Sequence, residues 1–246
     1  MLLAIDIGNT NISLGVFNGR RLVKRLTIST QAKNYAPQLK KIFRRHKITD
    51  AIICSVVGRA SQVLQKDLTR LLGKSPYYIG KGTSVPLKNL YRKPRQVGQD
   101  RLVNAYAAAS LYGVPAVIVD FGTAITFDVV TKHKEYLGGM ILPGLSLSLQ
   151  ALAQRTALLP DVKLGKPKEF IGRDTKSSML SGIVFGFAAL TDCLAQKLKS
   201  VLGKKIKVIG TGGNIGLMAR YCRCFDIINP DLTLKGLRLL YPIRNV

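Results

Sequence analysis

Two short segments, 114 residues apart, repeat one pattern: an apolar strand, an aspartate, a glycine turn and a second apolar strand. The segments are Asp6-Ile-Gly-Asn-Thr10 and Asp120-Phe-Gly-Thr-Ala124. Apolar residues alternate after the first turn and form a β-branched run before the second, as is typical of strands that enter a core. A pattern that restarts at this distance predicts an internal duplication, with two similar lobes facing each other across a cleft.

Strand patterns alternate with helical patterns in each half, which predicts an α/β fold. We expect strands at Leu22–Ile28, Ala51–Val57, Tyr77–Ile79, Tyr136–Met140 and Lys205–Ile209. We expect helices at Tyr35–His46, Ser61–Leu72, Arg101–Leu111, Ser146–Ala153, Ser177–Lys199, Ile215–Tyr221 and Leu232–Leu240. Residues 80–99 are predicted to be a loop, because prolines interrupt them. The predicted lobes are residues 1–113 and 114–246.

The chain has 246 residues, of which 47% are hydrophobic, and this length suits either one large domain or two small ones that share a cleft. Its four cysteines are scattered, which favours a reducing compartment over a disulfide framework. We see no export signal at the first residues and no apolar run near the ~18 residues that span a bilayer. These observations predict a cytoplasmic protein with no membrane partner.

The charge of the chain is strongly basic. Lys and Arg number 38 against 13 Asp and Glu, which gives a net charge of +25. Such a charge favours contact with nucleic acid, but no helix-turn-helix pattern or zinc-ligand spacing accompanies it. A solvated basic surface that binds polyanions without specificity explains it as well. With so few carboxylates, each aspartate inside an apolar segment is conspicuous.

The repeated turns suit phosphate binding. Glycine lets the backbone approach a phosphate closely, and the backbone N–H groups with the Asn and Thr side chains donate to its oxygens. An aspartate at the end of an apolar strand is costly to bury, and a nearby cation would offset that cost. One such turn alone is often only a β-turn, whereas two at the starts of duplicated lobes favour a nucleotide site. Gly210-Thr-Gly-Gly213 is a third glycine turn, suited to an adenosine or phosphate contact or simply to a tight connection.

Gly98-Gln-Asp100-Arg101 precedes a predicted helix. Asp100 there is either an N-cap or a general base that receives a hydroxyl proton during phosphoryl transfer. Arg101 would hold an anionic substrate group, and Asn104 lies one helical turn after Asp100.

Further short motifs extend the pattern. They are Tyr91-x-x-Pro94, Gly138-Gly-x-Ile-x-Pro-Gly144, Ile171-Gly-x-x-Thr175, Ser181-Gly-Ile183 and Leu232-Thr-Leu-Lys-Gly-Leu237. Together with the two phosphate turns and Gly98–Arg101, this set resembles the type III pantothenate kinase family, in the acetate/sugar kinase, actin and heat-shock ATPase superfamily. The motifs run in the family's order over nearly the whole chain.

The resemblance implies two ribonuclease-H-like lobes and ATP-dependent phosphorylation of the 4′-hydroxyl of pantothenate, the first step of coenzyme A synthesis. It implies that Asp100 is the base, and that Asp120 binds a monovalent cation, K⁺ or NH₄⁺, beside Mg²⁺. It also implies a homodimer, for which the small-residue helix at 177–199 is suited. The implied ATP contacts are Asp6, Ile7, Gly8, Asn9, Thr10, Asn11, Ile12, Ser13 and Thr123, and the implied pantothenate contacts are Tyr91, Gly98, Gln99, Asp100, Arg101 and Thr175.

Two features depart from the family pattern: Gln99 stands where a small residue is more usual, and the charge is unusually basic. Two other functions stay open from the residues alone. One is a binding protein that keeps the fold and uses its basic surface on nucleic acid, although such a protein has no chemical need for Asp6, Asp100 and Asp120. The other is a kinase of the same superfamily with a different acceptor.

Overall fold

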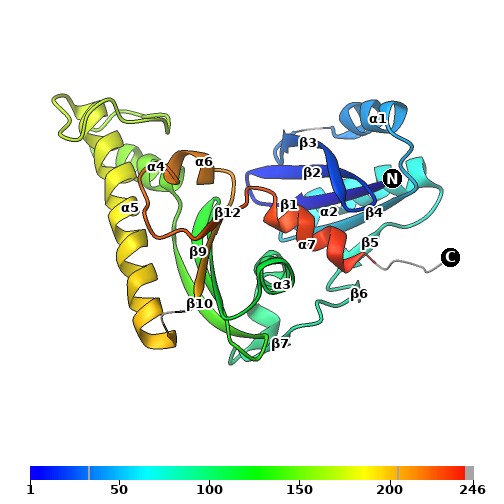
Figure 1. The fold of residues 1–246 in the computed structure, drawn as a ribbon. Coiled ribbons are helices and arrows are strands. Elements are labelled where there is room, and N and C mark those ends of the chain that lie inside the picture. The colour runs from blue at the N-terminus through cyan, green and yellow to red at the C-terminus, as the bar shows by residue number, and fades with distance from the viewer. Residues whose placement is uncertain (33, 204, 242–246) are drawn as a thin grey trace. The chain divides into compact units, whose positions relative to one another are not determined.

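The computed structural model describes residues 1–32, 34–203 and 205–241, and these fall into two compact units (Figure 1). The first unit contains Met1–Leu87, Arg92–Ser110 and the C-terminal stretch that begins at Leu232. The second unit contains Lys88–Tyr91 and Leu111–Asp231. Each unit is built on its own six-stranded sheet.

The sheet of the first unit has the strand order β3-β2-β1-β4-β5-β6. Strand β1 is central: it pairs antiparallel with β2 and parallel with β4. The strands are β1 (Leu2–Ile7), β2 (Asn11–Asn18), β3 (Arg21–Ser29), β4 (Asp50–Ser55), β5 (Tyr77–Ile79) and β6 (Gly82–Thr83).

Successive residues of β1 point to opposite faces of this sheet, so each face has its own core. On one face Leu3 and Ile5 pack in a cluster with α1 (Ala36–Arg45) and α2 (Gly58–Leu72). On the other face Leu2 and Ala4 pack in a cluster with α3 (Gln99–Tyr112) and α7 (Leu232–Leu240). Helix α7 therefore completes the first unit although it comes last in the chain.

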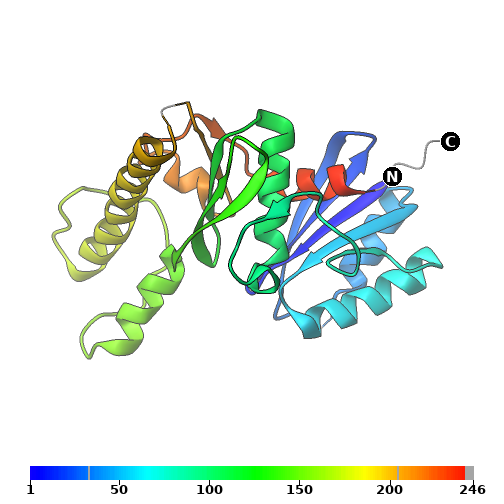
Figure 2. The same ribbon diagram turned by 90° about the horizontal axis from the view of Figure 1, so that it is seen from below.

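The sheet of the second unit has the order β12-β11-β8-β9-β10-β7, with β8 antiparallel to β9 and parallel to β11. Its strands are β7 (Lys88–Asn89), β8 (Ala116–Phe121), β9 (Ala124–Val130), β10 (Glu135–Pro143), β11 (Lys207–Thr211) and β12 (Ile227–Ile228). One face carries the core cluster shared by α4 (Leu145–Arg155), α5 (Thr175–Leu202) and α6 (Ile215–Met218). The ribbon in Figure 2 shows α5 on one side of this sheet.

Five strands of each sheet share one topology. In each, an antiparallel meander of three strands continues from its first strand into two parallel strands, so β1 corresponds to β8, β2 to β9, β3 to β10, β4 to β11 and β5 to β12. The sixth strands differ, because β6 pairs with β5 and β7 pairs with β10. A register shift also occurs at the same place in both meanders, at Val16/Phe17 and at Tyr136/Gly138. The predicted fold class, two α/β lobes of ribonuclease-H type related by duplication, is confirmed.

The domain boundaries differ from the prediction at residue 113. Residues 88–91 pair with β10 and belong to the second unit, while α7 belongs to the first. The reason is packing: a Cβ on Gly236 would lie 2.7 Å from Val103 Cγ1, so α7 contacts α3 closely. The end of the predicted second lobe, residues 242–246, lies outside the described residues.

Most predicted elements are present, with shifted ends. Helix α2 begins three residues earlier than expected, at Gly58, and α6 ends at Met218 instead of Tyr221. The region predicted as a loop, 80–99, contains β6, β7 and a short 3₁₀ turn at Pro94–Gln96. Very short edge strands leave no periodic pattern, because two residues show no alternation.

Helix α5 qualifies by length and composition as a bilayer-spanning helix, contrary to the sequence expectation. The helix has 28 residues, and 33% of its most apolar stretch is buried. Its buried residues, which include Val184 and Ala188, pack on the second sheet. Core helices of soluble proteins can be equally long and apolar, so the length and composition of α5 are weak evidence for a membrane.

Candidate active site

The first phosphate hairpin joins β1 to β2. Asp6 lies opposite Ser13 and Ile7 lies opposite Ile12 in the antiparallel register. The Gly8 N–H donates to the Asn11 carbonyl oxygen at 3.0 Å, which closes the turn. Asn9, Thr10 and Asn11 are exposed, while the Ile7 and Ile12 side chains are buried in the core. A phosphate can therefore meet three polar side chains here, and Ile7 and Ile12 can offer only backbone groups.

Thr30 holds this hairpin from the end of β3. Its hydroxyl donates to the Gly8 carbonyl at 2.7 Å, and its N–H donates to the Thr10 carbonyl at 3.0 Å. Two hydrogen bonds to alternate residues of the turn fix the turn's backbone. Sequence reasoning missed Thr30, because only the β2–β3 register brings it to a turn twenty residues earlier.

The second phosphate hairpin joins β8 to β9 and is one residue shorter. Asp120 lies opposite Thr126, and the Gly122 N–H donates to the Ala124 carbonyl at 3.1 Å. The Gly144 N–H donates to the Thr123 carbonyl at 3.1 Å, and a Cβ on Gly144 would collide with that oxygen. Gly144 is thus required for the β10–α4 turn to support the hairpin, and it leaves the Thr123 side chain exposed.

The predicted third glycine turn meets the Asp120 carboxylate. Gly212 has a φ of +96°, and a Cβ there would collide with Asp120 Oδ1 and lie 2.6 Å from the Phe121 nitrogen. The Asn214 N–H donates to the Phe121 carbonyl at 3.1 Å. The backbone of this turn therefore passes close to the Asp120 carboxylate at Gly212. Gly210 instead gives room to Ile215 and Phe225, so its role is packing.

A cation at Asp120 fits the chemistry of these donors. The Asp120 carboxylate offers hard oxygen ligands, which Mg²⁺, Ca²⁺ and alkali cations prefer. Among the described residues no group of three or more His, Cys, Asp or Glu side chains gathers to hold a metal ion. A single carboxylate carries one negative charge, which suits a cation of low charge.

Asp100 lies in the first turn of α3 and is not its N-cap. The Gly98 carbonyl accepts the first helical hydrogen bonds, from the Arg101 and Leu102 N–H groups at 3.2 and 3.4 Å. Asp100 Oδ1 accepts from the Arg101 N–H at 2.9 Å. A Cβ on Gly98 would collide with the same oxygen, so this glycine gives the carboxylate its position.

Burial raises the pKa of Asp100 above its ordinary value, and the Arg101 N–H and guanidinium oppose that shift only in part. Burial, followed by the charges of Asp6 and Asp100, also raises the pKa of Cys54, which pairs with Asp6 across β1 and β4. The two carboxylates therefore lie near one buried thiol, within the first unit. The structure brings the first hairpin and the predicted base together at the ends of β1 and β4.

Three residues near Asp100 in the chain, Gln99, Arg101 and Asn104, differ in what surrounds their side chains. The Arg101 side chain is 9% exposed. Asn104 is buried and accepts a hydrogen bond from the Thr233 hydroxyl of α7 at 2.7 Å, so it holds α7 to α3. Gln99 lies against Gly80, where an added Cβ would be 3.2 Å from Gln99 Cδ.

Tyr91 belongs to the second unit and follows β7. Its N–H donates to Asn89 Oδ1 at 3.0 Å, and its ring lies 6.5 Å from the Tyr136 ring, centroid to centroid. Gly138, with a φ of +131°, lies beside the Tyr91 ring. Tyr91 is half-buried, which leaves part of its side chain open to a ligand.

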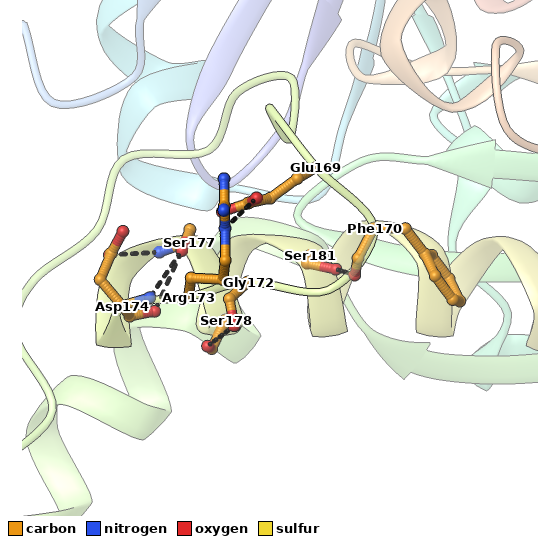
Figure 3. Close-up of polar contacts among 8 residues, drawn as sticks. All are labelled: Glu169, Phe170, Gly172, Arg173, Asp174, Ser177, Ser178 and Ser181. Atoms are coloured by element: carbon orange, nitrogen blue, oxygen red, sulfur yellow. Dashed lines mark hydrogen bonds and ion pairs between the residues drawn. The ribbon is translucent and has the colours of Figure 1, made fainter.

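Thr175 is the first residue of α5 and is exposed (Figure 3 shows its surroundings). The Ser177 N–H donates to Asp174 Oδ1 at 2.9 Å, and the Asp174 N–H donates to the Ser177 hydroxyl at 3.1 Å, which forms a capping box. Ser178 donates to the Gly172 carbonyl at 3.1 Å, and Ser181 donates to that of Phe170. Serines of α5 therefore hold the preceding loop and fix the position of Thr175.

The predicted site residues fall into two sets. The first unit carries Asp6–Ser13 and Gly98–Arg101, and the second carries Tyr91, Asp120, Thr123 and Thr175. Within each unit these residues sit on strand ends, tight turns and helix starts.

The sequence comparisons identify the family. A family model described as type III pantothenate kinase matches residues 2–197. A relative of that name in Moorella thermoacetica is 40% identical over 250 residues and covers 98% of each chain. Another, in Myxococcus xanthus, is 39% identical with the same coverage. The chain belongs to the type III pantothenate kinase family.

Two solved structures of proteins with other names have a fold similar to that of this type III pantothenate kinase. The ethanolamine utilization protein EutJ from Carboxydothermus hydrogenoformans has a TM-score of 0.54 and 15% identity, with coverage of 97% of this chain and 89% of that one. Component A of (R)-2-hydroxyglutaryl-CoA dehydratase from Acidaminococcus fermentans has a TM-score of 0.54 and 13% identity, with coverage of 96% and 94%. At these identities the likeness concerns the fold alone.

We expect Gly98→Ala to lower kcat at least ~10-fold, because the added Cβ displaces the Asp100 carboxylate and misplaced catalytic groups cost rate steeply. Gly58→Ala is the matched control: it also lies at a helix start of the first unit, and no atom lies within 4 Å of its Cβ. Steady-state kinetics on both variants, with melting temperatures, make the comparison. Equal kcat values would contradict the role given to Gly98.

Proposed function

We propose that the chain transfers the γ-phosphate of ATP to the 4′-hydroxyl of pantothenate. Its family is one of kinases, which use ATP with a divalent metal ion. The observation that supports the proposal best is the half-buried Asp100 carboxylate, whose pKa is raised by burial and which shares the first unit with a phosphate hairpin.

Asp100 is proposed as the general base. As the hydroxyl oxygen forms a bond to the γ-phosphorus, the bond from that phosphorus to the β–γ bridging oxygen breaks and ADP leaves. The hydroxyl proton passes to the Asp100 carboxylate. A carboxylate with a raised pKa is a stronger base near neutral pH than an ordinary one, which suits this step.

The two hairpins are proposed to bind the ATP phosphates. The first offers the exposed side chains of Asn9, Thr10 and Asn11, and the second offers Thr123. Each turn is held by backbone hydrogen bonds, so little ordering is needed when ATP binds. Mg²⁺ bound to the phosphates would neutralise charge that develops during transfer.

Pantothenate is an anion with hydroxyl groups, and the proposed acceptor residues match those groups. Arg101 provides a positive charge beside Asp100, Gln99 lies at the same helix start, and Gly98 gives the base its position. Tyr91 and Thr175 provide hydroxyls from the second unit. A sugar acceptor has no need for the cationic group, which favours pantothenate.

A monovalent cation, K⁺ or NH₄⁺, is proposed at Asp120. Support comes from the carboxylate at the end of β8, close to the Gly212 turn. Here the cation would offset the charge of Asp120 near the phosphates.

A homodimer through α5 is also proposed. The exposed residues Gly182, Gly186, Ala189 and Cys193 are small and recur every three or four positions on α5. They form one face of the helix, and small residues let a second helix approach closely. Burial of this face in a dimer accounts for the high hydropathy of α5 without a membrane. We infer a cytoplasmic location, where ATP is present and unpaired thiols persist.

We expect Asp100→Asn to lower kcat by at least ~10², because the amide cannot accept the proton. The same change should leave the melting temperature at pH 7 equal or higher. A carboxyl whose pKa is raised on folding costs stability once the pH rises through that pKa, and Asn removes this cost. Coupled-enzyme assays with ATP, pantothenate and K⁺ measure the first, and thermal denaturation the second. Folded wild-type protein that forms no phosphopantothenate would overturn the proposed function.

We expect Gly212→Ala to raise the K⁺ concentration needed for half-maximal activity, because the new Cβ collides with the Asp120 carboxylate. Its neighbour Gly213→Ala is the control, since no atom lies within 4 Å of that Cβ. Titration of activity with KCl at constant ionic strength separates the two variants. An identical K⁺ response in both would contradict a cation at Asp120.

We expect Gly186→Glu to convert a dimer into monomers, because it places a charge in the small-residue face of α5. Lys132→Gln changes the net charge equally at an exposed turn and should leave the dimer intact. Sedimentation velocity measures both, and a monomeric wild type would refute the dimer.

A further inference from the structure

Asp128 is a carboxylate in the interior of the second unit. It lies in the middle of β9 and is 0% exposed. The Tyr136 hydroxyl donates to Asp128 Oδ1 at 2.7 Å, and the Thr126 hydroxyl donates to Oδ2 at 2.9 Å. Burying a carboxylate costs several kcal/mol unless hydrogen bonds compensate, so its presence inside a strand needs a reason.

On one face of the sheet, polar side chains link Asp128 to Asp120, the proposed cation ligand, and to the segment of Tyr91, a proposed pantothenate contact. Alternation along β9 places Thr126 and Asp128 on one face, and Asp120 is the register partner of Thr126 on β8. Tyr136 is the register partner of Asn89, which precedes Tyr91 by two residues. A row of polar side chains therefore leads from the second phosphate hairpin to β7, the strand that precedes Tyr91.

Tyr136 holds Tyr91 through several contacts. Its carbonyl accepts from the Leu90 N–H at 2.8 Å, next to Tyr91 in the chain. Its ring packs on the Tyr91 ring at a tilt of 44°, within the range of favourable aromatic pairs. The Tyr136 ring is itself 0% exposed, and the hydroxyl bond to Asp128 fixes its depth in the core. The position of Tyr91 thus depends on the Asp128–Tyr136 pair.

The first unit provides an internal comparison for this pair. From the strand registers, Asp128 corresponds to Gly15 of β2, and Tyr136 corresponds to Leu22 of β3. In the first unit the Leu22 side chain fills the space beside Gly15: its Cδ1 lies 3.0 Å from the position that a Cβ on Gly15 would take. The first unit therefore has an apolar contact, Leu22 against Gly15, where the second unit has the hydrogen bond between Tyr136 and Asp128. A buried carboxylate is not a requirement of the fold, so in the second unit it serves something else.

We propose that Asp128 and Tyr136 form a positioning pair that holds Tyr91 for acceptor binding. The inference rests on the proposed function, because it takes Tyr91 as a contact of pantothenate. Neither residue touches the substrate; they act through the Tyr91 ring. The pair sets affinity for the acceptor and leaves ATP binding and the chemical step to other residues.

The first test is Tyr136→Phe, which keeps the ring and removes the hydroxyl. We expect KM for pantothenate to rise about 2- to 12-fold, the equivalent of one lost hydrogen bond. KM for ATP and kcat should stay within about twofold of wild type. Tyr241→Phe is the matched control, since Tyr241 also donates to an aspartate, Asp50, at 2.8 Å in the first unit. That variant should leave all three constants unchanged.

A double-mutant cycle decides whether Tyr136 acts through Tyr91. In a Tyr91→Ala background, Tyr136→Phe should cause no further rise in KM for pantothenate, because the group that it positions is gone. Equal effects in both backgrounds would overturn the proposal, as would no effect of Tyr136→Phe or of Tyr91→Ala on wild-type KM. Each of these results leaves the proposed function standing, whereas a wild type without pantothenate kinase activity removes the proposed function itself.

Asp128 gives a second route if Tyr136→Phe fails to fold. Asp128→Asn still accepts the Tyr136 hydroxyl and should keep KM for pantothenate within about twofold. Asp128→Leu removes the acceptor and should raise KM to the level of Tyr136→Phe. Equal KM values for the Asn and Leu variants, both folded by circular dichroism, would contradict the pair.

Discussion

The antiparallel pairs β1–β2 and β8–β9 place the two hairpins on which the proposed chemistry of this chain depends. Strands β1 and β8 pair on both edges and are buried on both faces, so they fix the register of everything around them. Each has an aspartate as its second-last residue, two positions before the glycine of the turn where the chain leaves the core. Because the strands are rigid, the polar groups of these turns are presented at fixed points. Phosphoryl transfer depends mainly on such positioning.

Duplication supplied this arrangement twice, and the two copies have since diverged in chemistry. The first turn has one more residue than the second and exposes three polar side chains, where the second exposes one threonine. The second is supported by glycine turns that could not carry a side chain, at Gly144 and Gly212. The copies therefore share a backbone plan, while the residues around Asp6 differ from those around Asp120.

Features formed by residues close together in the sequence could be predicted, whereas contacts between residues far apart in the sequence could not. The hairpins and Gly98–Arg101 are found from the sequence because aspartate, glycine and apolar strand lie within ten residues of one another. Thr30 and the α7 helix could not be placed, since an amphipathic pattern does not say which sheet or turn it will meet. Asp128 did give a signal, as a carboxylate within an apolar strand of a chain with few acids. Its partner Tyr136 emerges only from the β9–β10 register.

The order in which the chain is made has a consequence for how it folds. The first unit takes its last helix, α7, from residues that follow the whole of the second unit. Until Leu234 and Leu237 arrive, the face of β1 that carries Leu2 and Ala4 lacks part of its cover. A nascent chain would therefore expose apolar surface through most of its synthesis, and the final turns of helix would close the first sheet. The first unit is discontinuous in sequence, so no single cut in the chain separates it from the second.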